Sequence, residues 1–236
     1  MGIEVHHGTG SFQPVTSPET MYGTIARLGI VPFFVNDIPG FSIEELTPGG
    51  LWFDDDQLGP WDWKIFCVQS GDIAYGKFLR GKAAFATVEW YRELRNYRLS
   101  LPKYVPDERE RQILTYLDEN GSIGIKEVRG LMGIKKSAAD SLITRLQMQC
   151  RVVTGDIVRV YRGADLHYNG WQTSSFCKPE SLFSGGSIPG PGGFPFVEDM
   201  GLETGHSPEE SRDLLVGHIK KIAPQATGEQ ILKLLG

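Results

Sequence analysis

Gln147 and Gln149 lie two positions apart, at a point where helical apolar spacing gives way to strand-like alternation. Two amide side chains aimed at one atom could hold a reactant, so the pair is a candidate catalytic site. On a helix, side chains two positions apart point about 200° away from each other, whereas in an extended segment they share a face. The apolar residues Leu142, Ile143 and Leu146 favour a helix at least through Leu146. The pair can therefore converge only if the chain is already extended at Gln147; otherwise Gln147 ends the helix and Gln149 leads into the next strand.

Positive charge is concentrated in two segments of an otherwise acidic chain. The net charge is −5, yet residues 77–103 carry seven basic and two acidic side chains and residues 126–162 carry eight and three, so each segment has a net charge of +5. Clustered cations suit contact with nucleic-acid phosphates, although the same side chains could form an ordinary solvated surface. The predicted nucleic-acid contacts are Lys135, Lys136, Arg145, Arg151, Arg159, Lys77, Arg80 and Lys82.

Three aromatic residues could wall a pocket for an unstacked base. Trp61 and Trp63 would share one face of an extended segment, and Tyr75 alternates with the basic residues of a predicted hairpin. Aromatic faces beside cations suit nucleic acid. Anchoring in the core is the ordinary alternative, and it is the safer interpretation for the tryptophans. Asp62, between them, is a further candidate for positioning a water molecule.

The acidic stretch that contains Asp54, Asp55, Asp56 and Asp62 could coordinate a hard cation. It lacks the ligand periodicity and the glycine position of a calcium loop, so we expect a solvated acidic loop and no metal. The sequence contains no phosphate loop, dinucleotide fingerprint or serine elbow. We therefore expect no cofactor, and nothing supports a kinase, a hydrolase of the serine type or an oxidoreductase.

The elements that must position these residues predict an α+β fold. Helical spacing in "DERERQILTYLDEN" and "IKEVRGLMG" is followed by a third helix and then by "RVVTGDIVRVYR", which alternates around a turn at Gly155 and Asp156. Three short helices and a hairpin are the order of a winged helix, in which the third helix enters the major groove and the wing lies along the backbone. The predicted organisation begins with a flexible tail at 1–20 and an N-terminal α+β region at 21–105, for which a winged-helix-like fold is an alternative. A winged helix at 106–162, a long Gly/Pro-rich loop at 163–206 and C-terminal helices at 207–236 follow.

Composition indicates a soluble protein of the cytoplasm. Hydrophobic residues make up 40% of the chain, which is enough to build a core. The three cysteines are odd in number and far apart, so they suggest no disulfide framework. The N-terminus lacks a signal pattern, and no apolar run approaches the roughly 20 residues needed to cross a bilayer.

Several blocks of the sequence together resemble one protein family. They are "LGIVPFFVNDIPGFSIEEL" (28–46), "GPWDWK" (59–64), "IAYGKFLRGKAAF" (73–85), "LQMQ" (146–149) and the ending "PEESRDLLVGHIKKIAPQATGEQILKLLG" (208–236). The chain resembles the bacterial AlkZ-related proteins, which are distant relatives of the AlkZ/YcaQ winged-helix DNA glycosylases. The resemblance implies a fold of winged-helix units and a link to DNA, with the removal of alkylated or cross-linked bases as the activity of the distant relatives.

The resemblance does not carry over the catalytic motif of those glycosylases. They have a Gln-x-Gln or Gln-x-Asp pair early in the chain that positions a water at the sugar, whereas the early glutamines here (Gln13, Gln57 and Gln69) are not followed by such a partner. The Gln-x-Gln of this chain comes late, at Gln147 and Gln149. We therefore predict a DNA-binding winged-helix protein related to base-excision glycosylases, without requiring catalysis. The alternatives are an active glycosylase and a protein-interaction module whose Gly/Pro-rich loop at 184–197 is the contact surface.

Overall fold

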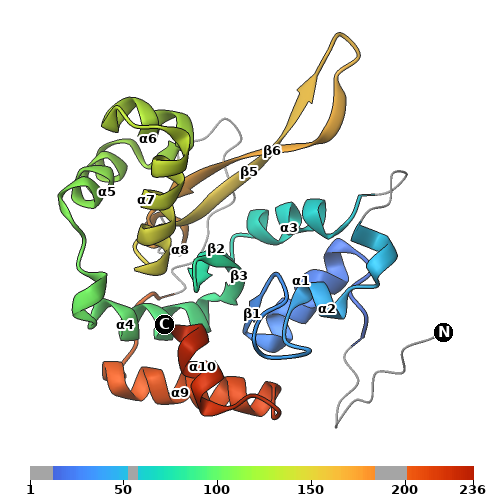
Figure 1. The fold of residues 1–236 in the computed structure, drawn as a ribbon, viewed down its shortest axis with the longest axis vertical. Helices are drawn as coiled ribbons and strands as arrows, with labels where there is room; N and C mark the ends of the chain where they lie inside the picture. Colours follow the sequence, from blue (N-terminus) through green and yellow to red (C-terminus); the bar gives the residue numbers. More distant parts are fainter. Residues whose placement is uncertain (1–12, 53–57, 184–200) are drawn as a thin grey trace.

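Two small antiparallel sheets and the helices around them make up the structure, a computed structural model that describes residues 13–52, 58–183 and 201–236 (Figure 1). One sheet has the strand order β1–β3–β2 and the other has the order β4–β6–β5. The α+β class predicted from the sequence is confirmed.

The first sheet and its helices form the N-terminal half of the chain. Strand β3 is central and pairs antiparallel with both neighbours, for example Val31 with Phe85 and Tyr75 with Phe85. The elements are α1 (Pro18–Leu28), β1 (Ile30–Pro32), α2 (Ile43–Leu46), the 3₁₀ turn η1 (Gly49–Trp52), α3 (Pro60–Gln69), β2 (Ile73–Leu79), β3 (Lys82–Thr87) and α4 (Val88–Leu99).

Two expectations for this half need correction. Helix α1 begins at Pro18, because the Ser17 hydroxyl accepts a hydrogen bond from the Thr20 backbone and proline suits the first helical position. Residues 18–20 therefore belong to a helix and not to the expected tail. The segment with the tryptophans is also helical from Pro60 onwards, since Pro60 follows the N-cap Gly59 and opens α3. The two tryptophans consequently do not share a face.

The second sheet lies with three helices in the following segment. The helices expected from the sequence are all present, and they are followed by a long hairpin that projects from the molecule (Figure 1). The elements are the 3₁₀ turn η2 (Pro102–Tyr104), α5 (Glu108–Asn120), β4 (Ser122–Gly124), α6 (Ile125–Met132), α7 (Lys136–Met148), β5 (Val153–Arg162), β6 (His167–Cys177) and α8 (Pro179–Phe183).

The hairpin turn is not where the sequence predicted it. Gly155 and Asp156 lie inside β5, at an irregularity in its pairing with β6, and the chain turns at residues 163–166. Gly155 is needed for close approach, because a Cβ atom there would lie 2.9 Å from the Sγ of Cys177. The loop expected at 163–206 therefore contains strand β6 and helix α8. Its Gly/Pro-rich part, from 184 to 200, lies outside the described residues.

The core has two parts. Buried side chains of the N-terminal half pack with those of the C-terminal helices, while a smaller cluster that includes Ile113, Val128 and Leu146 lies between α5, α6 and α7. The base of the hairpin, with Ile157 and Cys177, belongs to the larger cluster. The hairpin thus links the two halves of the molecule.

The C-terminal helices α9 (Pro208–Ile222) and α10 (Gly228–Leu235) lie at the end of the molecule opposite α6 (Figure 1). Helix α9 packs against α4, where the Trp90 and His218 rings stack with centroids 3.7 Å apart and an angle of 15° between their planes. His218 Nε2 lies 2.8 Å from the carbonyl oxygen of Leu28. The glycine that follows, Gly29, is the C-cap of α1.

The burial of His218 predicts a dependence of stability on pH. Burial lowers the pKa of His218, although the Leu28 carbonyl and Glu89 oppose this and Lys221 adds to it. The unfolded chain therefore binds a proton more readily than the folded chain. The stability contributed by neutral His218 is present in full above the unfolded pKa of about 6.5, and it is lost as pH falls below that value. We expect urea denaturation to show a loss of stability between pH 7.5 and pH 5.5 that is smaller in His218→Gln, which keeps a donor but does not titrate. An equal loss in both proteins would contradict this assignment.

Candidate nucleic-acid interface

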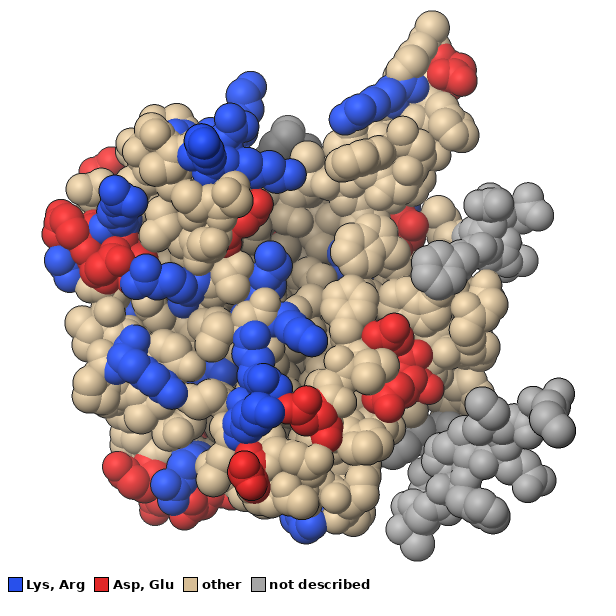
Figure 2. Space-filling view, in the orientation of Figure 1, with Lys and Arg blue, Asp and Glu red and all other residues tan. Residues whose placement is uncertain are grey.

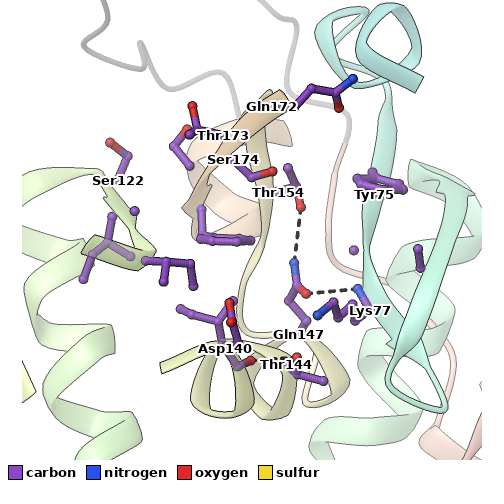
Figure 3. Close-up of a pocket in the computed structure, with 18 of the residues that line it drawn as sticks. Tyr75, Lys77, Ser122, Asp140, Thr144, Gln147, Thr154, Gln172, Thr173 and Ser174 are labelled. Carbon is purple, nitrogen blue, oxygen red and sulfur yellow. Dashed lines mark hydrogen bonds between the residues drawn. The ribbon is translucent and has the colours of Figure 1, made fainter. Parts of the chain in front are cut away.

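A cavity of about 960 Å³ lies between the two sheets. Its walls come from β2 and β3 on one side, α6 and α7 on another, and β4 with the inner face of the β5–β6 hairpin on a third, while α3 contributes at one end (Figure 3). Segments far apart in the sequence therefore form one site, and its size suits a nucleotide-sized ligand.

Five lysines line this cavity, against two carboxylates. Glu127 is one of the two acids, and its side chain is already engaged with the backbone N–H of Gly124 at 2.6 Å. In the space-filling view, basic side chains gather along the hollow at the centre of the face (Figure 2). In a chain of net charge −5, this excess of basic over acidic side chains distinguishes the cavity. The lysines are Lys64, Lys77, Lys82, Lys126 and Lys136, and the second acid is Asp140.

Three of the predicted nucleic-acid contacts thus line the same cavity. They are Lys77, Lys82 and Lys136. They come from two basic segments separated in the sequence. Sequence reasoning missed Lys64 and Lys126 as members of the same site. The only available signal for Lys64 was its position at the end of "GPWDWK", and a single lysine there is not distinctive.

The predicted arginines are arranged differently. Three of them form ion pairs: Arg80 with Asp37 at 2.6 Å, Arg145 with Asp107 at 3.0 Å and with Glu110 at 3.1 Å, and Arg159 with Asp62 at 3.0 Å. Arg151 is half-buried, and its Nε lacks a hydrogen-bond partner within the described chain. Lys135 is exposed and lies at the N-cap position of α7, next to Lys136 of the cavity wall.

The two glutamines do not form one site. Helix α7 continues through Met148, so Gln147 lies within it and Gln149 is its C-cap. The Gln147 side chain faces the cavity and spans two walls: its Oε1 accepts from the Lys77 N–H at 3.0 Å, and its Nε2 donates to the Thr154 hydroxyl at 3.3 Å (Figure 3). Gln149 is buried elsewhere, and its Oε1 has no hydrogen-bond partner among the residues described. Both atoms of the Gln147 amide are therefore occupied in joining β2, α7 and β5.

Of the predicted base-pocket residues, Trp61 and Tyr75 line the cavity. Trp61 is 44% exposed, and Tyr75 is almost fully buried in the wall, which raises its pKa. Trp63 points into the core instead. Phe34, which the sequence did not single out, adds a third aromatic wall, with its ring centroid 6.3 Å from that of Trp61.

Asp62 lies at the centre of a hydrogen-bonded cluster that joins α3 to the hairpin. Its Oδ1 accepts from Arg159 Nε at 3.0 Å, from the Tyr168 hydroxyl at 2.6 Å and from Gln172 Nε2 at 3.3 Å. The carboxylate is nearly buried, and three donors from the hairpin share its Oδ1. Its position supports a role in orienting the hairpin.

Lys64 is part of the same cluster. Its Nζ donates to the Trp61 carbonyl oxygen at 2.7 Å and to Gln172 Oε1 at 2.6 Å, and it lies 3.5 Å from the centroid of the Trp61 ring. Burial lowers the pKa of Lys64 to about 7, and the neighbouring Asp62 carboxylate opposes this shift.

Within the described ranges, no three histidine, cysteine or carboxylate side chains are grouped as metal ligands. Asp54, Asp55 and Asp56, considered as ligands from the sequence, lie outside those ranges. No helix in the described part of the chain is both long and apolar enough to cross a membrane. The cysteines at 67, 150 and 177 are buried and free.

A family model described as AlkZ related matches residues 15–236. The chain belongs to the AlkZ-related family. The match includes every wall of the cavity, the projecting hairpin and the C-terminal helices, and it confirms the resemblance found in the sequence blocks. No curated protein matches the chain, and no solved structure matches it.

Proposed function

We propose that this AlkZ-related chain is a winged-helix DNA-binding protein whose lysine-lined cavity holds the nucleic acid. The observation that carries the proposal is the grouping of five lysines in one cavity of an acidic protein. The four exposed lysines among them, from β2, β3, α6 and α7, would release counterions from DNA on binding, which makes affinity fall steeply with salt. The family relationship supports a role connected with base excision.

The projecting hairpin supports contact with a duplex. Tyr161 and Trp171 are more than half exposed on it, and the Arg162 guanidinium lies 5.5 Å from the centroid of the Trp171 ring. An exposed aromatic beside a cation suits contact with bases or sugars next to phosphates. The hairpin would therefore lie along the DNA while the cavity holds one nucleotide.

The position of α7 favours DNA over a protein partner. Its first turn, with Lys136, is exposed and borders the cavity. Helix α9 packs on α4, and α10 packs on α9. The first turn of α7, the helix expected to enter the major groove, is thus open to a nucleic acid, while the later part of α7 bonds to β2 through Gln147.

The cavity also supports the recognition of an extruded base. Trp61, Tyr75 and Phe34 supply aromatic surface, and the polar side chains of Gln147 and Thr154 also line the cavity. Proteins that act on bases extrude the nucleotide into such a pocket and pay a few kcal/mol for unstacking, least where the base is damaged or absent. We expect tighter binding to DNA with a damaged or missing base than to intact duplex.

The triple variant Lys77→Gln, Lys82→Gln and Lys136→Gln tests the interface. Removing three phosphate contacts should weaken binding at about 0.1 M salt by at least tenfold and reduce the slope of log Kd against log salt by roughly two to three. Fluorescence anisotropy of a labelled duplex, titrated at several salt concentrations, measures both quantities.

A control variant with the same change in charge is Lys103→Gln, Arg109→Gln and Lys221→Gln. These side chains are exposed and lie outside the cavity wall. We expect this variant to bind DNA within about twofold of the parent, because distant exposed charges are screened. Equal weakening in both variants would place the interface elsewhere, and no binding by the parent protein at low salt would overturn the proposal.

A further inference from the structure

Lys64 differs from the other lysines of the cavity. It is only 3% exposed, whereas Lys77, Lys82, Lys126 and Lys136 are exposed. It is nevertheless part of the cavity wall, beside the half-exposed ring of Trp61. A buried amine facing a large cavity is unusual, because the loss of hydration disfavours a charged ammonium.

The contacts of Lys64 suit a neutral amine. A neutral amine has two N–H groups and one lone pair, and two acceptors are present: the Trp61 carbonyl oxygen at 2.7 Å and Gln172 Oε1 at 2.6 Å. The ring of Trp61, 3.5 Å away, shields the amine from water on one side and would also attract an ammonium. With both N–H groups engaged, the lone pair is left for a carbon electrophile.

Gln172 is held in the orientation that this arrangement needs. Its Nε2 donates to the Asp62 carboxylate at 3.3 Å, and a carboxylate can only accept. The Gln172 Oε1 must therefore face Lys64 as an acceptor. Asp62 is in turn fixed by Arg159 and Tyr168, so the amine is placed by a rigid cluster that spans α3 and the hairpin.

The protonation of Lys64 agrees with the geometry. Because burial lowers the pKa of this lysine to about 7, a substantial fraction of the amine is neutral near neutral pH. Neutral lysine amines attack aldehydes and ketones to form imines. The substrate class for such a residue is a carbonyl compound.

We propose that Lys64 forms a reversible imine with the ring-opened aldehyde of an abasic site held in the cavity. The inference rests on the proposed function, since the exposed lysines around Lys64 would hold the phosphates on either side of the sugar. An abasic sugar lacks the base, so it can enter the cavity deeply enough to reach a wall residue.

The reaction balances without a co-reactant. The Lys64 nitrogen lone pair attacks the aldehyde carbon, and one of the two amine hydrogens passes as a proton to the carbonyl oxygen to give a carbinolamine. The hydroxyl group then leaves as water with the second amine hydrogen, and a carbon–nitrogen double bond forms. Nothing is oxidised or reduced, and addition of water reverses the step and regenerates the amine and the aldehyde.

Reductive trapping tests this inference. The full-length protein is incubated with a duplex that contains one abasic site in the presence of cyanoborohydride, which converts an imine into a stable secondary amine. We expect a covalent protein–DNA adduct that peptide mapping by mass spectrometry assigns to Lys64. Trapping should increase as pH rises through about 7, and Lys64→Met should reduce it by roughly 100-fold or more. The variant Lys103→Met, at an exposed lysine outside the cavity wall, should change it by less than about threefold.

The outcomes separate this inference from the proposed function. Binding of the abasic duplex without an adduct at Lys64 overturns the imine and leaves the DNA-binding proposal intact. An absence of binding in the parent protein overturns both. An adduct that maps to an exposed lysine also overturns the inference. Lys64→Arg keeps N–H donors for the Trp61 carbonyl oxygen and Gln172 but cannot form an imine, so it should bind abasic DNA without being trapped even if Lys64→Met fails to fold.

Discussion

Arg98→Met is expected to lower the free energy of unfolding by about 3–5 kcal/mol, which makes it one of the most destabilising single changes in the chain. Arg98 is fully buried on α4. Its guanidinium donates to the carbonyl oxygens of Phe78, Met148 and Leu235, with distances of 2.9 Å for Nη1 to Met148 and 3.1 Å for Nε to Leu235. Methionine fills a similar volume but leaves three buried carbonyl groups without this donor.

The same three carbonyls explain why the change should also affect the cavity. Phe78 lies on β2, Met148 ends α7 and Leu235 ends α10, so one side chain ties two cavity walls to the C-terminal helix. Loosening β2 from α7 should also disturb Gln147, which bonds to the β2 backbone. We therefore expect Arg98→Met to weaken DNA binding even where the protein remains folded.

Urea denaturation followed by tryptophan fluorescence and circular dichroism measures the loss of stability. Arg109→Met is the matched control, because the same substitution at an exposed helical position should change stability by less than about 0.5 kcal/mol. Arg98→Lys should be intermediate, since one ammonium cannot reach all three carbonyls. A loss below about 1 kcal/mol in Arg98→Met would show that the three carbonyls find other donors.

Local signals in the sequence predict most of the helices, and they fail where a residue acts through a distant contact. The helical spacing in "DERERQILTYLDEN" and "IKEVRGLMG" predicts two helices that the structure confirms as α5 and α6. Gly155 indicated a turn, but it is a glycine because Cys177, twenty-two positions later, lies against it. Neither the alternation nor the composition of the segment contains that information.

The candidate site shows the same limit. The sign of the charge in both basic segments could be predicted, and Lys77, Lys82 and Lys136 do meet in one cavity. The ion pairs that neutralise Arg80 and Arg159 could not be predicted, because the acidic partners lie 43 and 97 positions away in the sequence. A count of charge by segment therefore includes arginines that are already ion-paired. It also overlooks the buried lysine, Lys64. Only the fold decides which charges are left for a ligand.

Gly29→Ala is expected to lower the free energy of unfolding by about 2–4 kcal/mol, although it adds a single methyl group. Gly29 has a φ of 71°, which L residues adopt with strain. A Cβ atom there would also lie 2.3 Å from Cδ1 of Trp90. The indole cannot move away easily, because it is stacked on His218 at 3.7 Å. The methyl group must therefore separate α4 from α9, and thermal or urea denaturation should report the loss.

A double-mutant cycle separates the steric effect from the backbone strain. In a Trp90→Ala background the clash with the indole is absent and the contact with His218 Nε2 at 3.0 Å remains, so Gly29→Ala should cost only about 1 kcal/mol, and the coupling energy should be about 1–3 kcal/mol. Gly23→Ala is the matched control, because nothing lies within 4 Å of a Cβ atom at this position inside α1. There the same substitution should stabilise the protein by about 0.5–1 kcal/mol through helix propensity. If Gly29→Ala proved neutral while Gly23→Ala stabilised, the close approach of Trp90 to Gly29 would not persist in solution, and α9 would have to be held on α4 by contacts other than the stacked pair.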